Sequence, residues 1–185
     1  MALSATIFKA GLQIADIDRS YYHDHALTIA RHPSETDERM MVRVLAFALH
    51  AHAALSFGRG LSSDDEPDLW QKDLTGAIET WIDVGQPDEK RLRRACGRAG
   101  QVFVYSYGGH GADMWWDQVS SKLERTRNLT VMRIPQAASQ ALAKLARRNM
   151  QLHCTVQEGQ VWLADEDHSV QVELTAIKTP PPALR

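Results

Sequence analysis

The first thirty residues alternate between apolar and polar side chains. From Thr6 to Ile14 every second residue falls on one side and most of these are apolar, which is the spacing of a strand with one buried face. The alternation resumes in residues 25–32 after the turn ADIDRS. The pattern therefore predicts a β-hairpin over residues 3–32.

A helical period replaces this alternation after the hairpin. Ser34 stands three residues before Asp37, the spacing of a capping box, and about twenty good helix formers follow. Strands and helices then alternate, with strands expected in residues 68–73, 77–84, 101–107 and 129–134 and helices in residues 87–98, 112–125 and 135–148. Such alternation favours α/β units with some parallel pairing, and the segment from Met150 to Ile177 returns to strands alone.

These elements predict a mixed α/β fold with two subdomains. Residues 34–148 are expected to form an α/β subdomain. Both chain ends, residues 1–33 and 149–185, are expected to form a β-rich subdomain built as a small antiparallel sheet or barrel. A groove between the subdomains would follow, and the Pro-rich tail is expected to be frayed.

Composition narrows the classes of function. The chain has 185 residues, 44% of them hydrophobic and 24% charged, which is ordinary for a folded globular protein. Its apolar runs are far shorter than the roughly 20 residues of a membrane helix, so we expect a cytoplasmic protein with no membrane partner. A net charge of −2 gives no overall attraction for nucleic acid, so any such binding must be local.

The predicted helix after residue 87 carries a local basic stripe. Arg91, Arg94 and Arg98 follow one another along one of its faces. Acidic residues at its start make it an ordinary amphipathic helix with charges that suit the helix dipole. The functional alternative is a weak, salt-dependent phosphate-contact face.

One carboxylate falls on the apolar face of the first predicted helix. Glu38 shares that face with Val42 and Leu45, whereas Arg39 and Arg43 are expected to be exposed. Burying a carboxylate without a partner is costly, so a raised pKa, a nearby arginine or a metal is needed. Arg31 or Arg59 could supply a structural salt bridge.

Residues 64–85, DDEPDLWQKDLTGAIETWIDVG, hold the densest group of carboxylates. On the first predicted strand Asp68 and Lys72 share a face, and on the second Glu79 and Asp83 do. If the two strands form a hairpin, Asp68 and one of the later acids could face the same cleft as Glu38. Three carboxylates placed in this way would suit Mg²⁺ or Mn²⁺.

Four stretches of the sequence carry a resemblance to a known family. They are ARHPSETDERM, GRGLSSDDEPDLW, WIDVGQPDEKRLRRAC and VWLADEDHSVQVELTAI, within residues 30–40, 58–70, 81–96 and 161–177. In this order they resemble the bacterial YaeQ family over essentially the whole chain. The resemblance implies a fold related to the PD-(D/E)XK nuclease superfamily, without an established activity.

The resemblance also implies roles for individual residues. Glu38 resembles the helical acid before the nuclease strands, Pro67–Asp68 the PD element, and Asp83 the acid of the third strand. The motif lysine is missing, because Gly85 stands in its place. If Glu79 is taken as the acid instead, Trp81 stands there.

Other cations could replace the missing lysine. Lys72 lies on the neighbouring predicted strand, and Lys90 or Arg91 on the following helix. A cation in this position would activate water and stabilise negative charge in the transition state. Without one, the site would be catalytically degenerate.

The sequence thus leaves three interpretations. One is a Mg²⁺- or Mn²⁺-dependent nuclease or phosphodiesterase, with Glu38, Asp68 and Asp83 as metal ligands and Glu79 and Lys72 as further catalytic residues. Another is a non-catalytic protein whose inter-subdomain groove binds an anion, a nucleic acid or a protein. A third is a buried salt-bridge network that holds two layers together.

Overall fold

The chain divides into two compact units, each assembled from segments that are distant in the sequence. The computed structural model describes residues 3–183. Unit 1 contains the chain up to Ala51 together with Pro135–Leu174, and unit 2 contains His52–Ile134 and the chain from Thr175 onward. Residues 34–51 and 135–148, which we expected in the α/β subdomain, have their contacts within unit 1.

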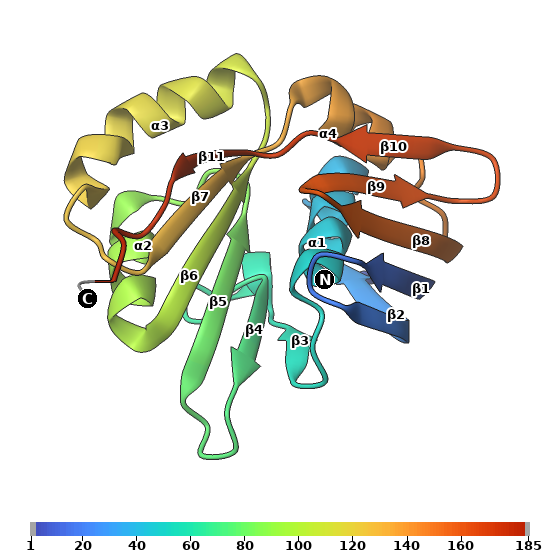
Figure 1. Cartoon of the computed structure of the whole chain (residues 1–185), viewed down its shortest axis with the longest axis horizontal. Coiled ribbons are helices and arrows are strands. Elements are labelled where there is room, and N and C mark those ends of the chain that lie inside the picture. Colours follow the sequence, from blue (N-terminus) through green and yellow to red (C-terminus); the bar gives the residue numbers. More distant parts are fainter. Residues whose placement is uncertain (1–2, 184–185) are drawn as a thin grey trace. The chain divides into compact units, whose positions relative to one another are not determined.

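Unit 1 is built on an open five-stranded sheet (Figure 1). Its strands, in spatial order, are β10 (Ser169–Val172), β9 (Gln160–Ala164), β8 (Asn149–Gln157), β1 (Thr6–Asp16) and β2 (Tyr21–Arg31). The predicted hairpin of β1 and β2 is confirmed, with Thr6 opposite Arg31 and Asp16 opposite Tyr21. The expectation of a purely antiparallel sheet or barrel is wrong, because β1 and β8 run parallel and the sheet does not close.

Two helices cover one face of this sheet. Helix α1 (Asp37–His50) contacts β1, helix α4 (Gln136–Ala143) contacts β10, and the two helices contact each other. The strands bury alternate residues on this face, as the burial of Phe8, Leu12 and Ile29 shows. The alternation read from the sequence therefore identifies the covered face correctly.

Helix α1 begins and ends at positions that differ from the prediction. Its N-cap is Thr36 rather than Ser34, and the Thr36 hydroxyl accepts a hydrogen bond of 3.1 Å from the backbone N–H of Arg39. Ser34 instead lies in a turn in which its side chain bonds to His32. The helix has 14 residues rather than about twenty, because the chain leaves it after His50 to form a short strand that the sequence analysis missed.

We expect Thr36→Ala to lower the free energy of unfolding by about 1 kcal/mol, the usual cost of losing a helix cap. Ser34→Ala is the matched control, since it removes a hydroxyl two residues earlier that caps nothing. Urea unfolding of both variants checks this, and a larger loss from Ser34→Ala than from Thr36→Ala would contradict the cap assignment.

A buried ion pair fixes the start of α1. Arg43, which we expected to be exposed, is buried, and its side chain donates hydrogen bonds to the carboxylate of Glu35 and to the carbonyl of Ala30, the latter at 3.0 Å. Glu35 also accepts a hydrogen bond of 2.6 Å from Arg39. The helix is buried all round from Met40 to Ala48, so Arg43 requires a carboxylate inside the core.

Unit 2 is built on a six-stranded mixed sheet (Figure 1). In spatial order the strands are β11 (Thr175–Lys178), β7 (Leu129–Arg133), β6 (Ala99–Ser106), β5 (Ile78–Val84), β4 (Leu69–Lys72) and β3 (Leu55–Phe57). The expected parallel pairing is confirmed for β5, β6 and β7. Strand β11 pairs antiparallel with β7, so the end of the β segment belongs to the sheet of unit 2 rather than to that of unit 1.

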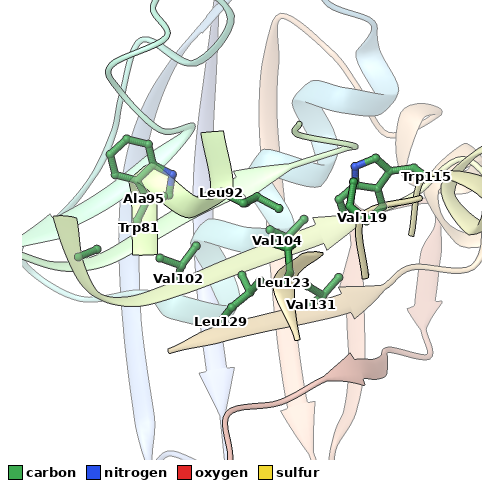
Figure 2. Packing of buried hydrophobic residues seen from close by; sticks show 11 residues of the cluster. Trp81, Leu92, Ala95, Val102, Val104, Trp115, Val119, Leu123, Leu129 and Val131 are labelled. Atoms are coloured by element: carbon green, nitrogen blue, oxygen red, sulfur yellow. The ribbon is translucent and has the colours of Figure 1, made fainter. Parts of the chain in front are cut away.

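Two helices pack on the parallel strands of unit 2. Helix α2 (Glu89–Arg98) and helix α3 (His110–Leu123) bury their apolar side chains against β5, β6 and β7. Figure 2 shows Leu92 of α2 and Leu123 of α3 among the strand residues Val102, Val104 and Val131. A short 3₁₀ turn, Gly60–Ser62, lies in the loop before β4.

No helix within residues 3–183 is long and apolar enough to cross a membrane.

Candidate functional site

The β4–β5 hairpin brings two of the predicted carboxylates together. The strands pair antiparallel with Leu69 opposite Ile82, so Asp68 and Asp83 meet at one end of the hairpin. The backbone N–H of Asp68 donates to Oδ1 of Asp83 at 3.4 Å, and that of Val84 donates to Oδ2 of Asp68 at 2.8 Å. Both aspartates are 1% exposed.

Arg91 of helix α2 supplies the cation next to these carboxylates. Its Nε donates to Oδ2 of Asp83 at 2.8 Å and its Nη2 to Oδ1 at 3.0 Å. This is the two-point geometry in which a guanidinium and a carboxylate bind most strongly. The Asp88 side chain caps α2 by accepting the N–H of Arg91 at 2.8 Å, so the cap of the helix places Arg91 beside the strand end.

The surroundings of Arg91 keep its guanidinium protonated. Burial alone would lower the pKa of Arg91, but its hydrogen bond to Asp83 and the negative charges of Asp83, Asp68 and Asp64 together raise it. The guanidinium therefore stays charged throughout the ordinary pH range. A carboxylate as buried as that of Asp83 requires such a partner, because desolvation penalises an unpaired ion.

The same helix face holds the acidic loop in front of β4. Arg91 also donates to the backbone carbonyls of Asp64 at 3.3 Å and Glu66 at 2.8 Å. Arg98 donates to the carbonyl of Asp65 at 2.9 Å, and Arg94 reaches its carboxylate at 3.4 Å. The basic stripe predicted from the sequence thus faces the loop of residues 64–66 within the chain itself.

An aromatic side chain lies under the arginines. The guanidinium carbons of Arg91 and Arg98 lie 5.8 Å and 5.3 Å from the ring centre of Trp81, which is 1% exposed. Contacts of this kind favour a cation over an aromatic face. Trp81 therefore contributes both to the core below the sheet and to the position of the arginines.

The other predicted site residues lie in different surroundings. Glu38 belongs to unit 1 and accepts a hydrogen bond of 2.6 Å from the hydroxyl of Ser139. Glu79 is exposed and accepts a bond of 2.8 Å from Gln71. Lys72 is exposed, and its Nζ lies 3.7 Å from the ring centre of Trp70. Lys72 is the last residue of β4, at the opposite end of the strand from the buried Asp68.

The arginines proposed as partners of Glu38 pair elsewhere. Arg31 forms an ion pair with Asp37, and Arg59 lies 3.7 Å from Glu66. Across residues 3–183 no three His, Cys, Asp or Glu side chains are grouped closely enough to hold a metal ion. Glu38 belongs to unit 1, whereas Asp68 and Asp83 belong to unit 2, and the catalytic or metal role of these three residues stays a prediction.

Arg91 was expected only as one of several candidate replacements for the missing lysine. A more specific signal was available in the segment IDVGQPDEKR, residues 82–91. A short turn from the end of a strand into a helix places the first turn of that helix beside the strand end. An arginine at the third helical residue is then close to the last acid of the strand.

Comparisons with known proteins cover nearly the whole chain. The family model described as "YaeQ protein" matches residues 1–174. The chain is 43% identical over 180 residues to proteins described as "Uncharacterized protein YaeQ" from Salmonella typhi and from Escherichia coli (strain K12), covering 97% of this chain and 99% of each relative.

Solved structures agree with this match. The crystal structure of YaeQ protein from Xanthomonas axonopodis pv. citri is 48% identical with a TM-score of 0.92, covering 96% of this chain and 100% of that one. The crystal structure of YaeQ protein from Pseudomonas syringae is 37% identical with a TM-score of 0.91, covering 95% and 97%. Both in sequence and in structure, this chain belongs to the YaeQ family.

Proposed function

We propose that this chain is a non-catalytic binding protein whose paired aspartates are part of a structural ion-pair network. The observation that carries the non-catalytic part of this proposal is the two-point hydrogen bonding of Asp83 to Arg91. In a metal-dependent nuclease the corresponding carboxylate is a metal ligand. Here both carboxylate oxygens of Asp83 accept hydrogen bonds from Arg91 instead.

The fit of Mg²⁺ or Mn²⁺ to this arrangement is poor. Hard cations of this type need several oxygen ligands at short distances. Both Asp83 oxygens bond to Arg91, and Oδ2 of Asp68 accepts the N–H of Val84. A divalent ion at this position would also meet the positive charge of Arg91 directly, so we derive no step through a metal here.

The contacts of the arginine stripe speak against phosphate recognition by this helix face. Phosphate contacts rely on positive charges that can neutralise the ligand. Arg91, Arg94 and Arg98 all interact with the acidic loop of residues 64–66 instead. We therefore infer that this helix face stabilises unit 2 and that any ligand binds on another surface.

A second candidate function rests on the pairing of Asp68 with Asp83. Two adjacent carboxylates at the end of a strand hairpin resemble the acidic pair of the PD-(D/E)XK superfamily. In this proposal Glu38, Asp68 and Asp83 would bind Mg²⁺ or Mn²⁺ after Arg91 moved away, and Glu79 and Lys72 would assist. The many contacts of Arg91 make this the weaker of the two proposals.

Calorimetric titration of MnCl₂ and MgCl₂ into the wild-type protein distinguishes the two functions. We expect no saturable heat at millimolar metal, because the carboxylate oxygens are already bonded. We also expect no metal-dependent cleavage of single- or double-stranded DNA and RNA. Asp68→Ala and Asp83→Ala should give the same flat titrations.

The opposite outcome is equally well defined. Saturable metal binding in the wild type that both aspartate variants lose, together with cleavage that Glu38→Ala abolishes, would replace the non-catalytic proposal with the nuclease. Circular dichroism of each variant shows whether the loss reflects the ligand or the fold.

A further inference from the structure

The five-stranded sheet of unit 1 has a second face that helices α1 and α4 do not cover. Along β1, side chains on the helix side such as Leu12 and Ile14 are buried, whereas the alternate residues Ile7, Lys9 and Gln13 are exposed. Because side chains alternate across a strand, these residues define an outer face. The outer face of an amphipathic sheet is normally polar and solvated. A pocket on such a face is therefore unusual.

A pocket of about 520 Å³ lies on this outer face, across strands β1, β2 and β8. By alternation, the side chains that point into it are Gln13, Ala15, Tyr22, Asp24, His153 and Thr155. They form two cross-strand rows. In one row the short Ala15 lies between Tyr22 and Thr155, and this small residue leaves room between its neighbours.

The second row carries the polar groups. Gln13 of β1 lies opposite Asp24 of β2 on one side and opposite His153 of β8 on the other. Neighbouring strands lie about 4.8 Å apart, so these outer two residues face each other across roughly 10 Å. The row therefore places an amide, a carboxylate and an imidazole along a width that suits a small ligand.

The polar side chains of the pocket lie at the surface of the sheet. Among residues 3–183, the side chains of Gln13, Asp24, His153 and Thr155 have no hydrogen bond or ion pair with another side chain. Tyr22, which also lines the pocket, is 58% exposed.

The residues that line the pocket argue against anionic ligands and against thiol chemistry. It has no lysine or arginine among its lining residues, and Asp24 carries its one full negative charge. Phosphates and other anions would meet that carboxylate without a compensating cation. Thiol chemistry is also excluded, because Cys154 faces the core and burial raises the pKa of its thiol to about 12.

We infer that this outer-face pocket binds a neutral polyhydroxylated ligand of the sugar class. This inference rests on the proposed binding function and identifies its ligand class. Hydroxyl groups both donate and accept hydrogen bonds, and so match a mixed row of amide, carboxylate and imidazole. The exposed ring of Tyr22 offers an apolar face for the C–H groups of a sugar ring, and small-molecule sites commonly combine such a face with a few placed polar groups.

Titration of maltose into isotope-labelled protein, followed by amide NMR, tests this inference. We expect saturable shifts of the amides of Gln13, Asp24 and His153. Asp24→Ala is expected to weaken the binding about tenfold, the loss of one charge-assisted hydrogen bond. Thr28→Ala is the matched control, because Thr28 is an exposed β2 residue on the same face outside the pocket and its loss should change the affinity less than twofold.

Parallel titrations with glucose, inorganic phosphate and putrescine cover the competing ligand classes. The absence of any saturable shift with both sugars would overturn the inference, as would tighter binding of phosphate or putrescine at the same amides. Neither result affects the metal titrations, so a failure of this site and a failure of the non-catalytic function remain distinguishable.

Discussion

Replacing Arg91 by alanine is expected to lower the free energy of unfolding by about 3–5 kcal/mol, the usual cost of breaking a buried ion pair from one side. The variant leaves the carboxylate of Asp83, which is 1% exposed, without its cation. It also removes the donors to the carbonyls of Asp64 and Glu66, so the acidic loop loses its attachment to α2. Urea unfolding followed by circular dichroism measures the change.

Arg94→Ala is the matched control for this prediction. Arg94 lies on the same helix and faces the same loop, but its side chain is 50% exposed and its partner Asp65 is 81% exposed. Exposed pairs contribute about 0–1 kcal/mol, so this variant should unfold close to the wild type. Equal losses for the two arginines would show that Arg91 has no special structural role.

Glu35→Ala is expected to cost about 3–5 kcal/mol for the same physical reason. Its carboxylate is the shared acceptor of Arg39 and Arg43, whose side chains are 16% and 6% exposed. Removing it takes the ion-pair partner from the positive charge of Arg43, which lies inside the core of unit 1. Thermal unfolding should show a lower midpoint and, with urea, a lower free energy of unfolding.

Asp37→Asn provides the comparison for Glu35. Asp37 pairs with Arg31, but these side chains are 47% and 29% exposed. Water can solvate both ions when the pair is broken, so a loss of at most about 1 kcal/mol is expected. If this variant were as unstable as Glu35→Ala, burial would not be the cause of the large effect.

The strand pattern of the fold was predictable because alternation reports one buried face directly. Phe8 and Leu12 on β1 are buried as their spacing indicates. The parallel pairing of β1 with β8 was not predictable in this way, because alternation identifies the buried face of a strand but not the strand that pairs with it. The short strand at Leu55–Phe57 was missed because the helix formers around it favoured continuation of α1.

Local competition explains the error at the start of α1. Both Ser34 and Thr36 are good N-cap residues, and the capping-box spacing favoured Ser34. In the structure Ser34 bonds to His32, and Thr36 caps the helix. Side-chain hydrogen bonds over two or three residues have similar strengths, so the sequence alone does not choose between them.

The acidic pair of the candidate site was predictable, whereas its chemistry was not. Asp68 and Asp83 could be placed on neighbouring strands by their spacing, and the hairpin brings them together. Which cation they face depends on how α2 packs after Gly85, a turn with a positive φ of 90°. The contact between Asp83 and Arg91 is therefore a tertiary one. From the sequence, Arg91 was one of several candidate cations.

A double-mutant cycle on Arg91 and Asp83 tests the central claim most directly. Urea unfolding of the wild type, Arg91→Ala, Asp83→Ala and the double variant gives the coupling energy of the pair. We predict a coupling of about 2–3 kcal/mol, because the second substitution removes an ion that the first has already left unpaired. If the losses of the two single variants add up to that of the double variant within about 0.5 kcal/mol, the predicted coupling is contradicted. Asp83 would then be independent of Arg91 and open to another cation.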